Sequence, residues 1–251
     1  MMSRKIYIII LIALMSFSCK NDSLQLLSTE SFSEEYHGDC KGSDCALVTI
    51  DYIKIKSENE IANKINFTVG SAIIYYLNSN IEKSIQAATI SEASEKFIKN
   101  FENDKKEFPE ISPYFAEISV TESTIKENIL SLRVQQYSFT GGAHGNGSTK
   151  FLNFNPSTGV LIPNTSLMRN KGEFTEFVEE LFRKENNISP NESINSTGYW
   201  FENDKFSLPD AIGFTDDSLI IIYNQYEIAS YADGPIELTI PLEIAQRYLG
   251  F

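Results

Sequence analysis

The sequence predicts an α+β fold with a mainly antiparallel sheet, segregated helices and two fused subdomains. Segments with helical apolar spacing and segments typical of strands occur in blocks rather than in regular alternation, which favours α+β over α/β. Between residues 114 and 162, successive β-rich stretches are joined by short polar or glycine-rich turns, as in adjacent antiparallel strands. The chain of 251 residues is 42% hydrophobic, with 17 Phe and 12 Tyr, so a sizeable core can form.

The first residues predict export from the cytoplasm. Arg4 and Lys5 precede an apolar run over residues 6–15 that is too short to span a bilayer, and small residues and Cys19 follow it. This pattern resembles a bacterial lipoprotein signal peptide over residues 1–18, with Cys19 as the lipidated first mature residue. An ordinary secretory signal with an incidental cysteine is the alternative. We expect a protein anchored by its lipid in the bacterial cell envelope, on the periplasmic face or the outer surface.

The segment after the signal predicts a tether and a disulfide. Residues 19–39 are polar and lack apolar periodicity, as expected of a link between a lipid and a folded body. Cys40 and Cys45 flank four polar residues, and in an oxidising compartment we expect a disulfide between them. A metal site would need more ligands than two thiols and the nearby His37. We therefore expect no bound metal.

Residues 40–122 are predicted to form the N-terminal α+β subdomain. Its expected elements are a strand over 46–55, helices over 57–80 and 91–108, and a strand over 114–124. The first strand is rich in Val, Ile and Tyr. The first helix shows helical apolar spacing at Ile65, Val69 and Ile73, and the second begins near the capping residue Ser91 and ends before a proline.

Residues 123–251 are predicted to form the C-terminal α+β subdomain, which includes a glycine-rich hairpin. Its expected strands cover 128–140, 148–155, 160–162, 218–226 and 236–240, and its expected helices cover 172–184 and 242–249. The amphipathic pattern over 172–184 carries Phe174, Val178 and Phe182 on one side. The polar stretch 185–199 predicts a long loop, because it is rich in Asn and Ser and lacks periodicity.

Charge and motifs narrow the function classes. The formal net charge of −13 disfavours nucleic acid and favours basic partners, although solubility alone is a sufficient reason for it. Histidine occurs only at positions 37 and 144, and the sequence contains no zinc-protease, serine-hydrolase or phosphate-loop motif. We therefore expect a non-enzymatic protein without a cofactor. A glycoside hydrolase that uses a carboxylate pair needs no motif and stays an alternative.

Two stretches of the sequence carry a family resemblance. One runs from Tyr137 to Asn146 as Tyr-Ser-Phe-Thr-Gly-Gly-Ala-His-Gly-Asn, and the other combines Tyr223–Ile228 with Tyr-Ala-Asp-Gly at 231–234. Together they resemble the paired extracytoplasmic domains of unknown function in RsiV-type lysozyme-sensing anti-sigma factors and, outside the catalytic part, in PdaC-type peptidoglycan deacetylases. The resemblance implies an α+β module outside the cytoplasm with no catalytic activity assigned to it. One member type binds lysozyme.

These inferences define the candidate site and function. The proposed binding contacts are His144, Asn146, Tyr199 and Trp200. The motif residues expected to shape the backbone are Gly141, Gly142, Gly145, Tyr226, Glu227 and Gly234. We expect an envelope binding protein that recognises lysozyme or peptidoglycan. The alternatives are the carboxylate-pair hydrolase and a structural or assembly lipoprotein that holds a partner at the membrane.

Overall fold

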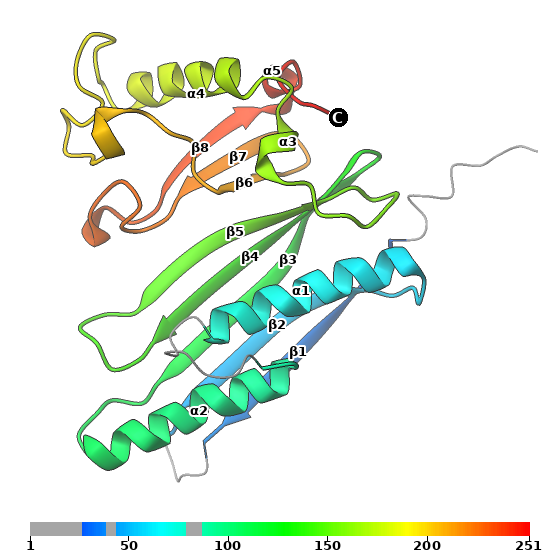
Figure 1. Ribbon diagram of the computed structural model, residues 1–251, viewed down its shortest axis with the longest axis vertical. Coiled ribbons are helices and arrows are strands. Elements are labelled where there is room, and N and C mark those ends of the chain that lie inside the picture. Colours follow the sequence, from blue (N-terminus) through cyan, green and yellow to red (C-terminus); the bar gives the residue numbers. More distant parts are fainter. Residues whose placement is uncertain (1–26, 39–43, 79–86) are drawn as a thin grey trace, which may run out of the picture.

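The computed structural model describes residues 27–38, 44–78 and 87–251, which form two sheets with helices on their outer faces (Figure 1). The first sheet has the strand order β1-β2-β3-β4-β5 and the second has the order β6-β7-β8. The strands and helices of the protein, in chain order, are β1 Thr29–His37, β2 Leu47–Ile55, α1 Glu60–Asn78, α2 Ile90–Glu107, β3 Phe115–Lys126, β4 Ile129–Phe139, β5 Asn146–Phe154, α3 Asn164–Leu167, α4 Lys171–Glu185, β6 Ala211–Phe214, β7 Ser218–Tyr223, β8 Ile236–Pro241 and α5 Leu242–Ala245. The predicted α+β class is confirmed.

The first sheet is antiparallel except between β2 and β3. These two strands are parallel because the chain crosses back over the sheet through α1 and α2, as parallel neighbours require. Both helices lie on one face of this sheet (Figure 1). They bury Val69 and Phe97 against sheet residues such as Ile50, in a single apolar cluster. The other face of β2 and β3 carries polar side chains, among them Asp51 and Glu117.

Strand β1 corrects the predicted tether over residues 19–39. It pairs antiparallel with β2 from Thr29↔Ile55 to His37↔Leu47. The prediction failed because β1, an edge strand, does not show the usual alternation of apolar and polar residues. Its inward positions include the charged Glu34, and its outward positions are largely Ser and Glu. Cys19 and Cys40 lie outside the described residues, so lipidation and the disulfide stay predictions.

Glu34 gives β1 a pH-dependent attachment to the sheet. Its carboxylate accepts hydrogen bonds from the hydroxyls of Tyr36 and Tyr52. Desolvation raises the pKa of Glu34, but the two phenol hydrogen bonds and the charge of Lys54 outweigh it, and the net pKa is lowered. A lowered pKa means that this stabilisation is complete above the ordinary glutamate range and is lost as the pH falls below it.

Replacing Glu34 with glutamine should therefore destabilise the protein in a pH-dependent way. We expect E34Q to lower the free energy of unfolding by about 1 kcal/mol at pH 7 and by much less at pH 3. Urea unfolding at both pH values measures the difference, and Glu30→Gln, at an exposed position on the same strand, is the control. An equal deficit at both pH values would contradict the role of the carboxylate.

The division between the two subdomains also differs from the prediction. The boundary expected at residues 122/123 lies inside β3, which pairs with β4 from Phe115↔Phe139 to Lys126↔Ile129. The chain changes sheets only after β5, through the segment that carries α3, α4 and the loop after α4. The composition does not change at this point, so local patterns could not locate it. The strand expected over 160–162 is a single bridge, Phe154↔Leu161, and the closing helix is the short α5.

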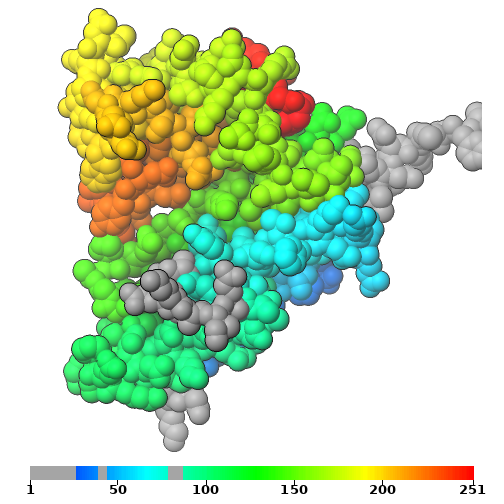
Figure 2. All heavy atoms as spheres, viewed as in Figure 1, coloured from blue at the N-terminus to red at the C-terminus, as the bar shows by residue number. Residues whose placement is uncertain are grey.

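Two asparagine side chains join the sheets. The amide of the buried Asn153 accepts a hydrogen bond from the Ser131 hydroxyl and donates one to the Ile212 carbonyl, both at 2.8 Å. The Asn224 amide bonds both the N–H (2.7 Å) and the carbonyl (3.1 Å) of Thr149. These bonds fix the end of β7 beside β5, and the space-filling view shows the two halves in direct contact (Figure 2). No helix within the described ranges is long and apolar enough to span a membrane.

Candidate binding surface

The two motif stretches meet in space at one edge of the molecule. The hairpin between β4 and β5 contributes Tyr137 and His144, and the connection between β7 and β8 contributes Tyr226 and Tyr231; we call these four residues the aromatic cluster. The His144 ring stacks on Tyr231 with centroids 3.9 Å apart. Its Nε2 lies 3.1 Å from the Tyr226 hydroxyl. In Figure 1 both connections lie at the left-hand side of their sheets.

Glycines allow the hairpin to close over Tyr137. A Cβ on Gly145 would lie 2.4 Å from the Cζ and the hydroxyl oxygen of Tyr137, so a larger residue here would displace the end of the Tyr137 side chain. Gly141 has a φ of +81°, which other residues rarely adopt. Desolvation and the neighbouring Tyr231 raise the pKa of Tyr137. Gly141 thus provides the turn geometry of the hairpin and Gly145 the space for Tyr137, while Gly142 lies exposed at the loop tip.

The β7–β8 connection is shaped by its own polar contacts. The Glu227 carboxylate accepts a hydrogen bond from the Asn224 N–H at 2.8 Å. Desolvation raises the pKa of Glu227, although this hydrogen bond opposes the shift. Tyr226 and Gly234 have φ values of +65° and +70°. Tyr226 combines this turn geometry with a side chain that is 53% exposed, so it is also available as a contact.

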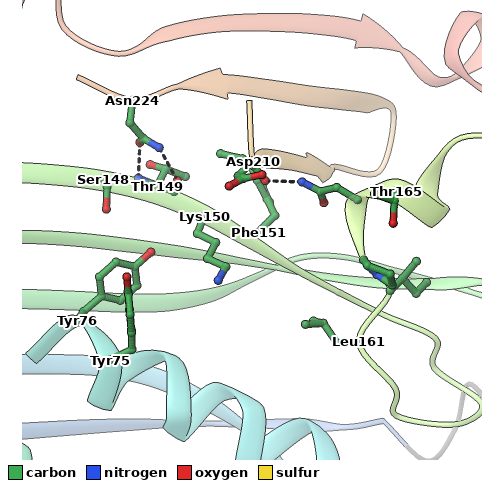
Figure 3. Close-up of a pocket in the computed structure, with 14 residues that line it drawn as sticks. Tyr75, Tyr76, Ser148, Thr149, Lys150, Phe151, Leu161, Thr165, Asp210 and Asn224 are labelled. Carbon is green, nitrogen blue, oxygen red and sulfur yellow. Dashed lines mark hydrogen bonds between the residues drawn. The ribbon is translucent and has the colours of Figure 1, made fainter. Parts of the chain in front are cut away.

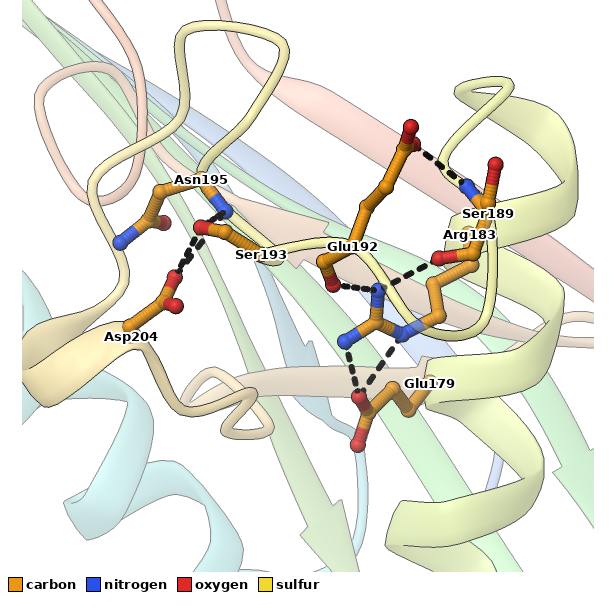
Figure 4. Close-up of polar contacts among 7 residues, drawn as sticks. All are labelled: Glu179, Arg183, Ser189, Glu192, Ser193, Asn195 and Asp204. Carbon is orange, nitrogen blue, oxygen red and sulfur yellow. Dashed lines mark hydrogen bonds and ion pairs between the residues drawn. The ribbon is translucent and has the colours of Figure 1, made fainter.

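The loop after α4 is held in one shape by the contacts in Figure 4. The Arg183 guanidinium pairs with the Glu179 carboxylate at 2.8 Å and donates to the carbonyls of Ser189 and Glu192. Further along, the Asn195 amide bonds both the N–H (2.7 Å) and the carbonyl (2.9 Å) of Phe201. These contacts give a defined shape to the loop that carries Tyr199 and Trp200.

The four predicted contacts have different surroundings. Tyr199 packs its ring against Phe182 and donates its hydroxyl to Asn186, which is the environment of a packing residue. Trp200 is 45% exposed, and its backbone N–H donates a hydrogen bond to the Ile228 carbonyl, two residues after Tyr226 of the aromatic cluster. Asn146 is exposed at the start of β5. His144 lies within the cluster itself.

Sequence patterns alone do not distinguish Tyr137 and Tyr231 as site residues. Both belong to the two motif stretches, so a signal for them existed. The stacking of Tyr231 on His144 could not be predicted, because it depends on how the two subdomains pack.

An acidic groove continues from the aromatic cluster across the open face of the first sheet. It has a volume of about 440 Å³. Polar residues of β2, β3 and β4 line it. We call five of them the open sheet face: Thr49, Asp51, Glu117, Ser119 and Gln135. Glu117 pairs with Tyr137 in the strand register, which connects this face to the cluster. No lysine or arginine lines the groove, all of whose lining residues are described.

The described residues contain no group of three or more His, Cys, Asp and Glu side chains that could hold a metal ion. The aromatic cluster and the open sheet face instead offer ring faces, hydroxyls and carboxylates at the surface. Such groups bind a partner by stacking, hydrogen bonding and charge.

Comparisons with known proteins agree with this architecture. Residues 39–147 match the family model described as deacetylase PdaC, and residues 164–243 match the protein family of unknown function DUF3298. No curated protein matches the chain.

Two solved structures of DUF3298 family proteins have a similar fold. The protein from Bacteroides fragilis NCTC 9343 is 21% identical, with a TM-score of 0.72 over 90% of this chain and 94% of that one. The protein from Pseudomonas aeruginosa PAO1 is 18% identical, with a TM-score of 0.66 over 89% of this chain and 94% of that one. The predicted resemblance is confirmed: the chain combines a PdaC-type region with a DUF3298 region in a DUF3298 fold.

Proposed function

We propose that this chain is a non-enzymatic binding protein of the bacterial cell envelope, anchored by lipid at Cys19, that recognises a lysozyme-like protein. The observation that carries the proposal is the convergence of the two motif stretches. His144 and Tyr226 are 82 positions apart in the sequence, yet they are in contact at the surface. A surface built from both subdomains suits recognition of a large partner.

The chemistry of this surface favours a basic protein as that partner. Tyrosine and tryptophan are enriched among the residues that dominate binding energy in protein interfaces, and the cluster presents Tyr137 and Tyr226 with Trp200 close by. Asp51 and Glu117 supply negative charge on the adjoining open sheet face. Lysozymes are basic, so these carboxylates would steer the encounter and add complementarity at the rim.

The carboxylate-pair hydrolase is the weaker alternative. Asp51 and Glu117 share the acidic groove on neighbouring strands, and both side chains are exposed on an open sheet. A retaining or inverting glycosidase needs one carboxylic acid kept protonated, which requires a desolvated site. The open sheet face offers both carboxylates the same exposed environment, and this supports binding rather than hydrolysis.

Calorimetric titration of the mature protein with lysozyme tests the proposal. We expect saturable binding near physiological salt that persists at several-fold higher salt, because buried aromatic contacts are less screened than surface charges. Cytochrome c, a basic protein of similar size, is the control for nonspecific attraction. Binding that disappears at high salt, or that is equally strong for cytochrome c, would show that only the net charge attracts lysozyme. Either result would contradict the proposal.

A further inference from the structure

A second groove lies between the two subdomains, on the other side of β5 from the acidic groove. Its volume is about 550 Å³, within the range of small-ligand sites. Helix α1 contributes Tyr75 and Tyr76, β5 contributes Lys150, and the segments before α3 and β6 contribute Leu161 and Asp210 (Figure 3). None of these residues belongs to the aromatic cluster.

Two tyrosines form one wall of this groove. Their rings are 5.7 Å apart in an edge-to-face arrangement. Tyr75 is 67% exposed, which is unusual for a large aromatic side chain and leaves a ring face open to the groove. Burial raises the pKa of Tyr76, and a hydrogen bond with the Ser148 side chain opposes the shift. A tyrosine hydroxyl is protonated at neutral pH and can donate a hydrogen bond. A flat ring beside hydroxyl groups is suited to a ligand with both apolar and hydroxylated faces.

Lys150 supplies the positive charge of the groove. It is the single Lys or Arg among the residues that line it, in a chain with 34 acidic and 21 basic residues. In Figure 3 its side chain extends into the space between the tyrosines and Leu161. A carboxylate-bearing ligand would therefore meet the ammonium group beside an aromatic ring.

The remaining polar groups mainly hold the walls in place. The Asn164 amide donates to the Asp210 carbonyl at 2.6 Å. The Asn224 amide is engaged with Thr149. The groove is thus preformed by contacts between the subdomains, which lowers the entropy cost of binding.

We propose that this groove binds a saccharide that carries a carboxylate. The sugar ring would lie against Tyr75, and the carboxylate would pair with Lys150. The groove is open and mixed in polarity, which favours a hydroxylated ligand over a purely apolar one. This inference does not rest on the lysozyme proposal, because the two sites share no residue.

NMR titration of the mature protein with three saccharides tests the inference. N-acetylglucosaminyl-N-acetylmuramic acid carries a carboxylate. N,N′-diacetylchitobiose, called chitobiose below, is its neutral counterpart, and digalacturonate carries carboxylates without the lactyl group. We expect about fivefold tighter binding of the muramic disaccharide than of chitobiose, a factor that corresponds to one partly exposed ion pair. Comparable binding of digalacturonate would extend the site to uronic acids, and weaker binding would restrict it to the lactyl carboxylate.

Two variants assign this binding to the groove. Lys150→Met should remove the preference for the charged disaccharide and leave chitobiose binding unchanged, whereas Tyr75→Ala should weaken both about fivefold or more. The matched controls are Lys99→Met on α2 and Phe67→Ala on α1, both exposed and outside the groove. The inference is overturned by the absence of saturable binding, by equal binding of charged and neutral disaccharides, or by a preference that survives in K150M.

Discussion

Replacing Gly213 with alanine is expected to destabilise the protein by at least about 2 kcal/mol, toward the upper end of overpacking effects. A Cβ on this glycine in β6 would lie 1.9 Å from Cδ1 and 2.1 Å from Cγ of the Phe151 ring. Phe151 is 5% exposed and belongs to a cluster with Ala211 and Ile220 at the junction of the sheets. The ring cannot move away without disturbing this junction. Urea unfolding followed by circular dichroism measures the loss.

A second glycine provides a control with the opposite sign. Gly70 lies within α1, and nothing approaches within 4 Å of the Cβ that alanine would add. Gly70→Ala should therefore stabilise the protein by about 0.5–1 kcal/mol through helix propensity. In the G213A background, Phe151→Leu should recover part of the lost stability because the smaller side chain makes room. A G213A protein as stable as the wild type would show that the sheets do not pack closely at this point.

The helices could be predicted from the sequence because their signals are local. The predicted ranges 57–80 and 172–184 agree closely with α1 and α4. The predicted cap Ser91 was wrong by two residues: the helix begins after Thr89, whose hydroxyl accepts the hydrogen bond from the Glu92 N–H. Both residues can cap a helix, and only the backbone geometry distinguishes them.

The elements that sequence reasoning missed depend on distant partners. Strand β6 is only four residues long, and its place depends on how Gly213 fits against Phe151. Strand β1 carries a glutamate at an inward position, which is stable there because tyrosine hydroxyls from β1 and β2 bind it. Neither of these contacts can be recognised from the residue pattern of the strand itself. The aromatic cluster is similar: the motifs were visible, but their contact across the two subdomains was not.

Replacing His144 with alanine is expected to weaken lysozyme binding by about 10- to 100-fold, a loss of about 1.4–2.8 kcal/mol that is typical of interface hot spots. The imidazole stacks on Tyr231 and contacts the Tyr226 hydroxyl. Its removal takes away the contact that holds these two rings in position for a partner. The side chain is exposed, and stability should change by less than about 0.5 kcal/mol. Calorimetry with lysozyme and urea unfolding of the same variant separate the two effects.

The comparison of binding with stability decides between the two roles of the glycine-rich loop. If His144 only shapes the hairpin, H144A should lose stability and retain affinity. If His144 is part of the binding surface, the affinity for lysozyme should fall while the stability of the protein stays the same. Tyr226→Phe refines the result, because it keeps the ring and removes only the hydroxyl that meets Nε2. Phe67→Ala removes an exposed aromatic ring from α1 and should leave lysozyme binding unchanged, since α1 covers the face opposite the open sheet face.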